Sequence, residues 1–219
     1  MLWVVATPVG DPQDLTLRAL EILKTCDVVL CESTKETSRL LRVHQISGKE
    51  YEVLNEHSSP EDVLRLLDLC RTKTVALVSD GGTPAFCDPG ADLVALCRKR
   101  GIPVKPALGA SSLMGLLSLA GRRLDQFVFR GFLPAETEAR RKSLRDLQKE
   151  RRPVVLMDTP YRLKKILAEL EEFFPQRIIF LVRDLSLPGE KFLEGKPAEL
   201  RRLCGDDKAE FMILLTSEE

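Results

Sequence analysis

The chain has 219 residues, of which 44% are apolar and 30% are charged. A folded chain of that length buries roughly 70% of its extended surface, and this composition excludes a disordered or coiled-coil protein. The 33 basic and 33 acidic side chains cancel. The chain therefore lacks the general positive field that nonspecific binding to nucleic-acid phosphates requires.

Short apolar runs recur along the whole chain, and segments with helical spacing separate them. This alternation is typical of parallel strands that are buried on both faces. The predicted strands, with a weaker one at Tyr51–Leu54, are Leu2–Ala6, Asp27–Cys31, Thr74–Val78, Pro103–Lys105, Phe127–Arg130, Val154–Met157, Ile178–Val182 and Phe211–Leu215.

Three helices have recognisable start signals, each with a proline at the expected first helical position. They are Ser59-Pro60, Asp88-Pro89-Gly90 and Thr159-Pro160. A capping side chain before each proline would accept an amide proton that the first turn leaves unpaired. The apolar positions that follow at helical spacing are predicted to be core, namely Val63, Leu66, Leu67 and Cys70 in the first helix, and Leu163, Ile166, Leu167, Leu170, Phe173 and Phe174 in the third.

The predicted fold class is α/β, with two α/β domains. A stretch rich in small residues, Ala107–Ala120, separates the two groups of strands. We place the domains at 1–108 and 109–219 and expect a ligand cleft between them, because such clefts are favoured ligand sites.

Cysteine and histidine usage argues against a metal centre. The six cysteines form no C-x-x-C pair, and His44 and His57 are the only histidines, so no zinc or haem site is expected.

The chain opens on Leu2-Trp3-Val4-Val5 without a basic leader, and it has no apolar stretch near 18 residues. We therefore expect neither secretion nor a membrane span, but a cytoplasmic protein with reduced thiols.

One segment departs from the even charge balance. Arg122–Arg152 holds ten Lys and Arg side chains against five Asp and Glu. It is the candidate contact for an anionic partner such as RNA, and the alternative is a solvated charged helix.

Small and polar residues follow the predicted strands. In a parallel sheet the ligand-binding loops lie past the carboxyl ends of the strands. The residues at these positions are Thr7–Gly10, Glu32–Lys35, Asn55–His57, Ser79–Pro84, Gly109–Ser112 and Asp158–Tyr161.

The pair Gly81-Gly82 is the strongest single signal, since adjacent glycines allow positive φ and close approach of the backbone to a ligand. An ordinary tight turn would also use them. The phosphate-binding pattern G-x-x-x-x-G-K-[ST] and the dinucleotide pattern G-x-G-x-x-G after the first strand are both absent. The segment Gly109–Leu113 lacks the second glycine of a hydrolase nucleophile elbow.

Glu32 and His57 are candidates for proton transfer. A carboxylate at a strand end costs desolvation energy unless a partner or a ligand offsets that cost, so Glu32 is either structurally paired or functional. His57, beside Glu56, is either a proton acceptor or a structural hydrogen-bonding residue.

Taken in order, these loops resemble the tetrapyrrole methylase superfamily, and most closely its bacterial small-subunit ribosomal RNA cytidine 2′-O-methyltransferases. The similar segments span nearly the whole chain and include Val5–Gly10, Glu32–Lys35, Asn55–His57, Ser79–Gly90, Gly131–Pro134 and Thr159–Leu163. The sequence departs from the usual rRNA-enzyme motifs at Ser33 and Lys35, in Leu108–Ser112 and in Asp158–Tyr161.

The resemblance implies an S-adenosylmethionine-dependent methyltransferase with the cofactor in the interdomain cleft. Carried over to this sequence, the cofactor-binding residues are Pro8, Asp80, Gly81, Gly82, Thr83, Phe86, Ser111 and Ser112, with Asp158 on the far side of the cleft. Glu32, His57 and Asp80 are the candidates to orient the acceptor or take its proton.

The resemblance also implies a homodimer and, as acceptor, a ribose 2′-hydroxyl of small-subunit ribosomal RNA, with Arg122–Arg152 as the candidate contact to that RNA or to the small ribosomal subunit. The alternatives are a tetrapyrrole, another small molecule or a protein as acceptor. A module that binds the ligand without turnover is a further alternative, motivated by the altered positions Ser33, Ala110 and Asp158.

Overall fold

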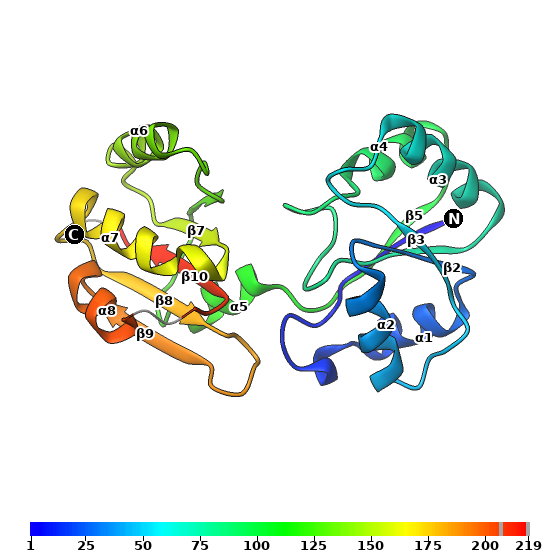
Figure 1. The fold of residues 1–219 in the computed structure, drawn as a ribbon, viewed down its shortest axis with the longest axis horizontal. Coiled ribbons are helices and arrows are strands. Elements are labelled where there is room, and N and C mark those ends of the chain that lie inside the picture. The colour runs from blue at the N-terminus through cyan, green and yellow to red at the C-terminus, as the bar shows by residue number, and fades with distance from the viewer. Residues whose placement is uncertain (206–207, 218–219) are drawn as a thin grey trace. The chain divides into compact units, whose positions relative to one another are not determined.

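The computed structural model describes residues 1–205 and 208–217 and divides into two compact units, Met1–Ser111 and Ser112–Glu219. Each unit is built on one five-stranded sheet (Figure 1). The α/β fold class with two sheets is therefore confirmed. Every helix in the described part of the chain is too short or too polar to cross a bilayer.

The first unit is a parallel sheet in the order β3-β2-β4-β1-β5. Its elements are β1 (Leu2–Val5), the 3-10 turn η1 (Pro12–Asp14), α1 (Leu17–Thr25), β2 (Val28–Cys31), α2 (Thr34–Val43), β3 (Glu50–Val53), α3 (Pro60–Thr72), β4 (Val75–Leu77), α4 (Ala91–Lys99) and β5 (Val104–Ala107). All seven residues of β2 and β4 are buried. That burial explains why their sequences read as continuous apolar runs.

Helices cover both faces of this sheet, as Figure 1 shows. Leu23 of α1 and Leu41 of α2 pack in one cluster with Val29 of β2. Leu66 of α3 and Leu93 of α4 pack in another cluster on the opposite face. The predicted core of α3 is confirmed at Leu66, Leu67 and Cys70, while Val63 is half-buried against the same cluster.

The predicted helix start at Ser59 is confirmed, whereas the predicted start at Asp88 is wrong. Ser59 caps α3, and its side chain and that of Asp62 form a reciprocal capping box. The predicted cap at Asp88 is wrong, because α4 begins at Ala91 after Gly90, which has φ +121° and no side-chain cap. Asp88 is thereby left out of the helix, in the loop after β4.

The second unit has a mixed sheet in the order β6-β7-β10-β8-β9. Its elements are α5 (Ser112–Leu119), β6 (Val128–Gly131), α6 (Thr137–Leu147), β7 (Val154–Asp158), the 3-10 turn η2 (Pro160–Arg162), α7 (Leu163–Phe173), β8 (Ile179–Arg183), β9 (Lys191–Gly195), α8 (Pro197–Cys204) and β10 (Phe211–Leu215). Among the described strands of this unit only β6 and β7 pair in parallel, and β10 pairs antiparallel with both β7 and β8. The prediction of parallel strands throughout is therefore wrong for this unit, and β9 was not predicted.

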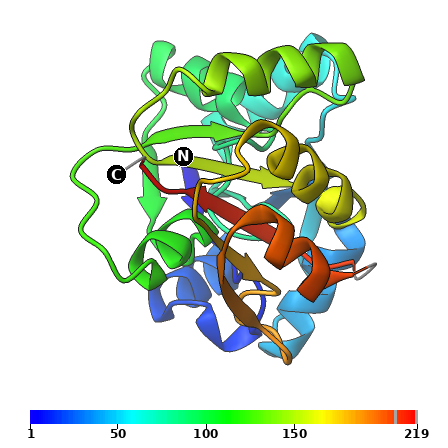
Figure 2. The same ribbon diagram turned by 90° about the vertical axis from the view of Figure 1, so that its left-hand side faces the viewer.

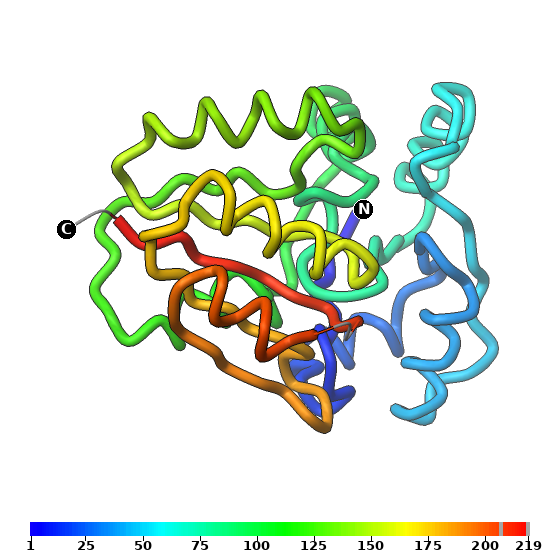
Figure 3. Tube along the Cα trace, turned by 60° about the vertical axis from the view of Figure 1, so that its left-hand side comes forward, coloured from blue at the N-terminus to red at the C-terminus, as the bar shows by residue number. Residues whose placement is uncertain are grey.

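Helices α7 and α8 lie in front of this sheet in Figure 2, and α5 packs against its other face. The predicted α7 core is confirmed at Leu163, Ile166, Leu167, Leu170 and Phe174, while Phe173 is half-buried. Because β10 runs antiparallel to β7, Phe211 lies opposite Asp158. The start of β10 and the start of α7 consequently meet at one end of the unit (Figures 2 and 3).

Candidate functional site

The carboxyl ends of four neighbouring strands of the first unit carry the predicted ligand loops. In the order β2-β4-β1-β5 these strands are adjacent and parallel. The loops that begin at Glu32, Val78, Ala6 and Leu108 therefore leave the sheet side by side. The loop with His57 follows β3, the edge strand on the far side of β2.

The turn with the two glycines is fixed to the end of β1 by backbone pairing. The Thr7 N–H donates to the Gly82 carbonyl at 2.8 Å, and the Gly82 N–H donates to the Thr7 carbonyl at 3.0 Å. The Thr7 hydroxyl also donates to the Ser79 carbonyl at 3.0 Å, and Ser79 Oγ lies 3.2 Å from the Gly82 carbonyl. These hydrogen bonds tie the turn to the end of β1.

The same turn reaches both the first and the fifth strand ends. A Cβ on Gly81 would lie 3.5 Å from the Pro8 carbonyl oxygen. The Thr83 hydroxyl donates to the Ala110 carbonyl at 3.3 Å, next to Ser111 in the chain. The structure therefore brings together the loops of Pro8, Gly81–Thr83 and Ser111. Ser112 begins α5 in the second unit.

Between Gly82 and Gly90 the chain repeatedly takes positive φ. Gly82 has φ +91°, and the non-glycine residues Ala85 and Cys87 have φ of +63° and +64°. Such conformations cost energy outside glycine and concentrate at ligand sites. Phe86 stands between these two positions with its side chain about half exposed.

Three carboxyl groups gather at the ends of β2 and β4. Glu32 accepts a hydrogen bond from the backbone N–H of Asp80, and Asp80 accepts one from the backbone N–H of Ser33. Burial, with the Asp88 and Asp80 charges, raises the pKa of Glu32 to about 7. Burial and the charge of Asp80 raise the pKa of Asp88 to about 6. Burial likewise raises the pKa of Asp80. These shifts favour either bound protons or a cationic ligand.

The raised pKa of Glu32 gives a definite pH dependence of stability. An unfolded chain releases this proton near pH 4.5, whereas the folded chain holds it to about pH 7. The stabilising contribution of Glu32 is therefore complete below about pH 4.5, falls as the pH rises, and levels off above about pH 7. We expect Glu32→Gln, which is always neutral, to show a shallower fall in the free energy of unfolding. Urea denaturation across this window measures the difference, and equal slopes for the two proteins would contradict the raised pKa.

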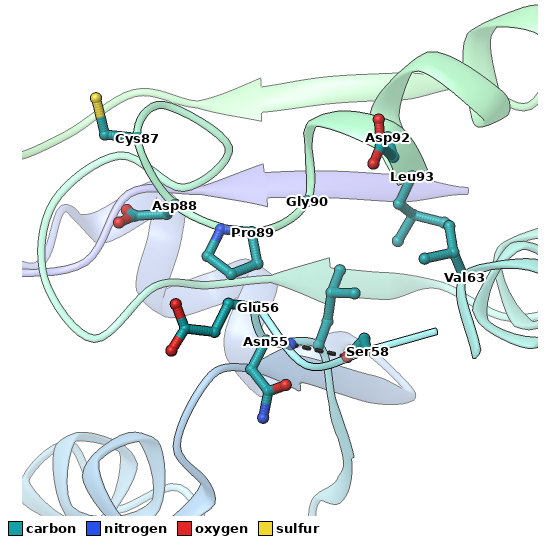
Figure 4. Close-up of a pocket in the computed structure, with 11 residues that line it drawn as sticks. Asn55, Glu56, Ser58, Val63, Cys87, Asp88, Pro89, Gly90, Asp92 and Leu93 are labelled. Carbon is teal, nitrogen blue, oxygen red and sulfur yellow. Dashed lines mark hydrogen bonds between the residues drawn. The ribbon is translucent and has the colours of Figure 1, made fainter. Parts of the chain in front are cut away.

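A pocket of about 350 Å³ lies beside these acids, between the loop after β3 and the start of α4 (Figure 4). Glu56 and Asp88 both line it, and the Asn55 N–H donates to Ser58 Oγ at 3.0 Å beneath it. His57 does not line this pocket; its side chain is 84% exposed, and its Nε2 lies 3.6 Å from the Glu56 carboxylate.

Asp88 was not predicted as a site residue, because the Pro-Gly sequence that follows it is typical of a helix start. In the described residues no group of three or more His, Cys, Asp or Glu is arranged to hold a metal ion.

Asp158 ends β7 in the second unit and is almost fully buried. Its Oδ1 lies 3.2 Å from Nη1 of Arg162 and accepts the Thr159 N–H at 2.8 Å. Its Oδ2 is buried without a hydrogen-bond partner, and burial raises the pKa of this carboxyl. A buried acceptor with spare capacity is what a ligand-contacting carboxylate requires. Its predicted contact with the same cofactor as Gly81 and Ser111 stays a prediction.

The basic segment Arg122–Arg152 is largely neutralised within its own unit. Arg140 is wholly buried against Glu169, so it cannot contact an external partner. Four further arginines pair with acids, namely Arg122 with Glu194, Arg123 with Asp125, Arg141 with Glu172 and Arg152 with Glu150. The surplus of positive charge in the sequence therefore overstates the charge that this segment offers to RNA.

Comparison with known proteins shows the family. The model of the Tetrapyrrole (Corrin/Porphyrin) Methylases matches residues 1–201. The chain belongs to the tetrapyrrole methylase family. A protein named Ribosomal RNA small subunit methyltransferase I from Neisseria meningitidis serogroup B is 39% identical over 94% of this chain and 71% of its own length. One of the same name from Leptospira biflexa is 37% identical over 98% of this chain and 90% of its own length.

Solved structures of tetrapyrrole methylase folds superpose on nearly the whole chain. A uroporphyrin-III C-methyl transferase from Thermus thermophilus, in complex with S-adenyl homocysteine, has a TM-score of 0.67 at 23% identity and covers 98% of this chain and 96% of its own. A diphthine synthase has a TM-score of 0.73 at 14% identity, with 98% and 89% covered. These likenesses confirm the fold. Membership of the family confirms the predicted class of enzyme, an S-adenosylmethionine-dependent methyltransferase.

Proposed function

We propose that this chain transfers a methyl group from S-adenosylmethionine to a ribose 2′-hydroxyl of small-subunit ribosomal RNA. The observation that carries the proposal is the 37–39% identity, over nearly the whole chain, to proteins named as small-subunit ribosomal RNA methyltransferases. A homodimer in the cytoplasm forms part of the same proposal.

Two features of the first unit support the proposed binding of this cofactor. S-adenosylmethionine carries positive charge on its sulfonium and amino groups and negative charge on its carboxylate. Burial, with the charges of neighbouring acids, raises the pKa values of Glu32 and Asp88, and a cation beside these carboxyl groups would stabilise their charged form. The turn at Gly82 has no side chain to obstruct a nucleoside, and its φ suits glycine. When bound, the cofactor supplies an electrophilic methyl group whose leaving group is a neutral thioether.

Each predicted cofactor residue has a proposed part. Backbone groups of the turn and small hydroxyls would hold the methionine and adenosine moieties, and Asp158 would contribute its spare carboxylate oxygen. The residues proposed for cofactor binding are Pro8, Asp80, Gly81, Gly82, Thr83, Phe86, Ser111, Ser112 and Asp158.

Glu32 is the proposed group for orienting the acceptor hydroxyl and taking its proton. A general base works best when its pKa lies near the working pH, and the pKa of Glu32 is about 7. The Asp80 N–H donates a hydrogen bond to this carboxyl. Correct orientation of the reactants lowers such barriers by roughly 7–11 kcal/mol, so alignment matters more here than base strength. Asp80 is proposed to hold Glu32 through its backbone N–H. His57 is the weaker candidate for taking the proton, because its side chain is exposed.

Methyl transfer from radiolabelled S-adenosylmethionine tests the proposal. Small ribosomal subunits from a strain deleted for this gene are the acceptor, and subunits from the parent strain are the matched control. We expect label to enter the ribosomal RNA of the deletion strain alone. Label on uroporphyrinogen or on a protein instead would establish one of the other acceptor classes. Cofactor binding without label on any acceptor would indicate a module without turnover.

A further inference from the structure

Tyr161 is the most exposed aromatic side chain in the described part of the chain, with 76% of the residue accessible. It lies in η2, directly after β7, at the sheet end where Asp158 lies. Leu163, two residues further along the chain, is fully buried. An exposed ring at a predicted site is a candidate contact surface, because apolar area left in water is a cost that a partner can remove.

The turn that carries this ring is anchored on both sides. Before the ring, the Thr159 N–H donates to Asp158 Oδ1. After it, Arg162 pairs with the same carboxylate and donates to the carbonyls of Leu133 at 3.3 Å and Pro134 at 3.1 Å. The exposure of Tyr161 is therefore a fixed property of a held turn.

One lysine contacts the ring, and two more follow it closely along the chain. The Lys208 ammonium lies 4.9 Å from the ring centroid, because residues before β10 reach the carboxyl end of β7 in the antiparallel pairing. Lys164 and Lys165 are exposed in the first turn of α7. Glu210 is an exposed acid at this end, and Asp206 and Asp207 lie outside the described residues. An aromatic face with an adjacent lysine is the combination that binds single-stranded nucleic acid.

We propose that Tyr161 stacks an unpaired base of the RNA substrate and that Lys208 contacts the neighbouring phosphate. The inference rests on the proposed RNA substrate and assigns its contact to the end of β7, in place of the largely neutralised Arg122–Arg152 segment. A base stacks on one face of a ring, and an ammonium beside that ring is available to a phosphate next to the stacked base.

The decisive variants are Tyr161→Ala and Tyr161→Phe. The probe is a fluorescein-labelled single-stranded oligocytidylate, and its affinity is read by fluorescence anisotropy. We expect Tyr161→Ala to weaken binding by roughly 5- to 150-fold, the range of a single base stack. Tyr161→Phe, which keeps the ring, should stay near wild type. Leu119→Ala removes an exposed apolar side chain on α5 and is the control, with no change expected.

Lys208→Gln tests the phosphate contact through its salt dependence. Loss of one contact should reduce the slope of log affinity against log salt concentration by about 0.7 for a single strand. Lys149→Gln removes another exposed lysine, which pairs with Asp146 at 3.6 Å, and should leave the slope unchanged.

The outcomes separate this inference from the proposed function. The proposed stacking contact is supported if Tyr161→Ala weakens oligonucleotide binding and raises the KM for small ribosomal subunits. The affinity of this variant for S-adenosylmethionine should be unchanged. Equal affinities of Tyr161→Ala and wild type, or no binding of the oligonucleotide by the wild type, overturn it. In that case, methylation of the subunits by the wild-type chain leaves the proposed function standing.

Discussion

Glu169→Gln is expected to lower the free energy of unfolding of the second unit by about 3–5 kcal/mol, the range for a buried ion pair that loses one charge. Arg140 is completely buried, and its Nε and Nη2 donate to the Glu169 carboxylate at 2.7 and 2.8 Å. Removing the carboxylate charge leaves the buried guanidinium without the counter-charge to which it is hydrogen-bonded. Urea denaturation of the wild type and the variant measures the loss in the free energy of unfolding.

A neighbouring pair on the same two helices provides the control. Arg141 of α6 and Glu172 of α7 are also paired, but both side chains are substantially exposed. Solvent screens such a pair, so Glu172→Gln should cost about 1 kcal/mol or less. Similar losses for Glu169→Gln and Glu172→Gln would contradict the account of the buried pair.

The Arg140 guanidinium does more than pair with Glu169. Its Nη1 also donates to the Ala135 carbonyl at 2.7 Å, in the loop that Arg162 holds through the Pro134 carbonyl. The double variant Arg140→Met/Glu169→Leu removes both charges. It should recover part of the loss but leave the Ala135 carbonyl unpaired, at a cost of about 1–3 kcal/mol.

Gly82→Val is expected to weaken S-adenosylmethionine binding by about tenfold or more. Gly82 has φ +91°, a conformation that is strained for a β-branched residue. Both its backbone N–H and its carbonyl pair with Thr7, so relief of the strain moves the turn away from the end of β1. Calorimetric titration with the cofactor measures the change in affinity.

Gly101→Val separates a local effect on the cofactor from a general loss of stability. Gly101 also has positive φ, +69°, and no atom lies within 4 Å of its missing Cβ. It follows the C-terminal end of α4, away from the strand-end loops. Gly101→Val should therefore lower stability without weakening cofactor binding. Equal cofactor affinities of Gly82→Val and wild type would remove the turn from the proposed site.

The sequence predicted the positions of the strands better than their directions. The predicted strands coincide with observed ones to within one or two residues, because buried strands read as uninterrupted apolar runs. Direction depends on pairing, and nothing in Phe211–Leu215 itself distinguishes an antiparallel strand from a parallel one. The edge strand β9, Lys191–Gly195, was missed because its mostly exposed residues give no such run.

The burial of Arg140 in α6 was also not predicted from the sequence. Arg140 lies in a basic run that reads as exposed, yet it is buried. A signal was present, since Arg140, Leu144 and Leu147 share helical spacing and all three are buried. Its partner Glu169 is 29 residues away in the sequence, and a single sequence does not reveal that pairing.

The candidate site was foreseeable where it followed from strand ends. Glu32 directly follows β2 and Asp80 lies in the loop after β4, and adjacency of β2 and β4 brings them together. The part of Asp80 in cofactor binding came from the family resemblance. Their raised pKa values were not foreseeable, because those depend on burial and on Asp88. Whether Asp158 contacts the same ligand as the turn at Gly82 remains a prediction.

The most direct measurement is a map of 2′-O-methylated nucleotides in small-subunit ribosomal RNA by nuclease digestion and mass spectrometry. The RNA comes from a strain deleted for this gene and complemented with the wild-type chain or with Gly82→Val. We expect one methylated cytidine to be absent in the deletion strain, restored by the wild type, and reduced or absent with Gly82→Val. An unchanged methylation pattern in the deletion strain would contradict the proposed function.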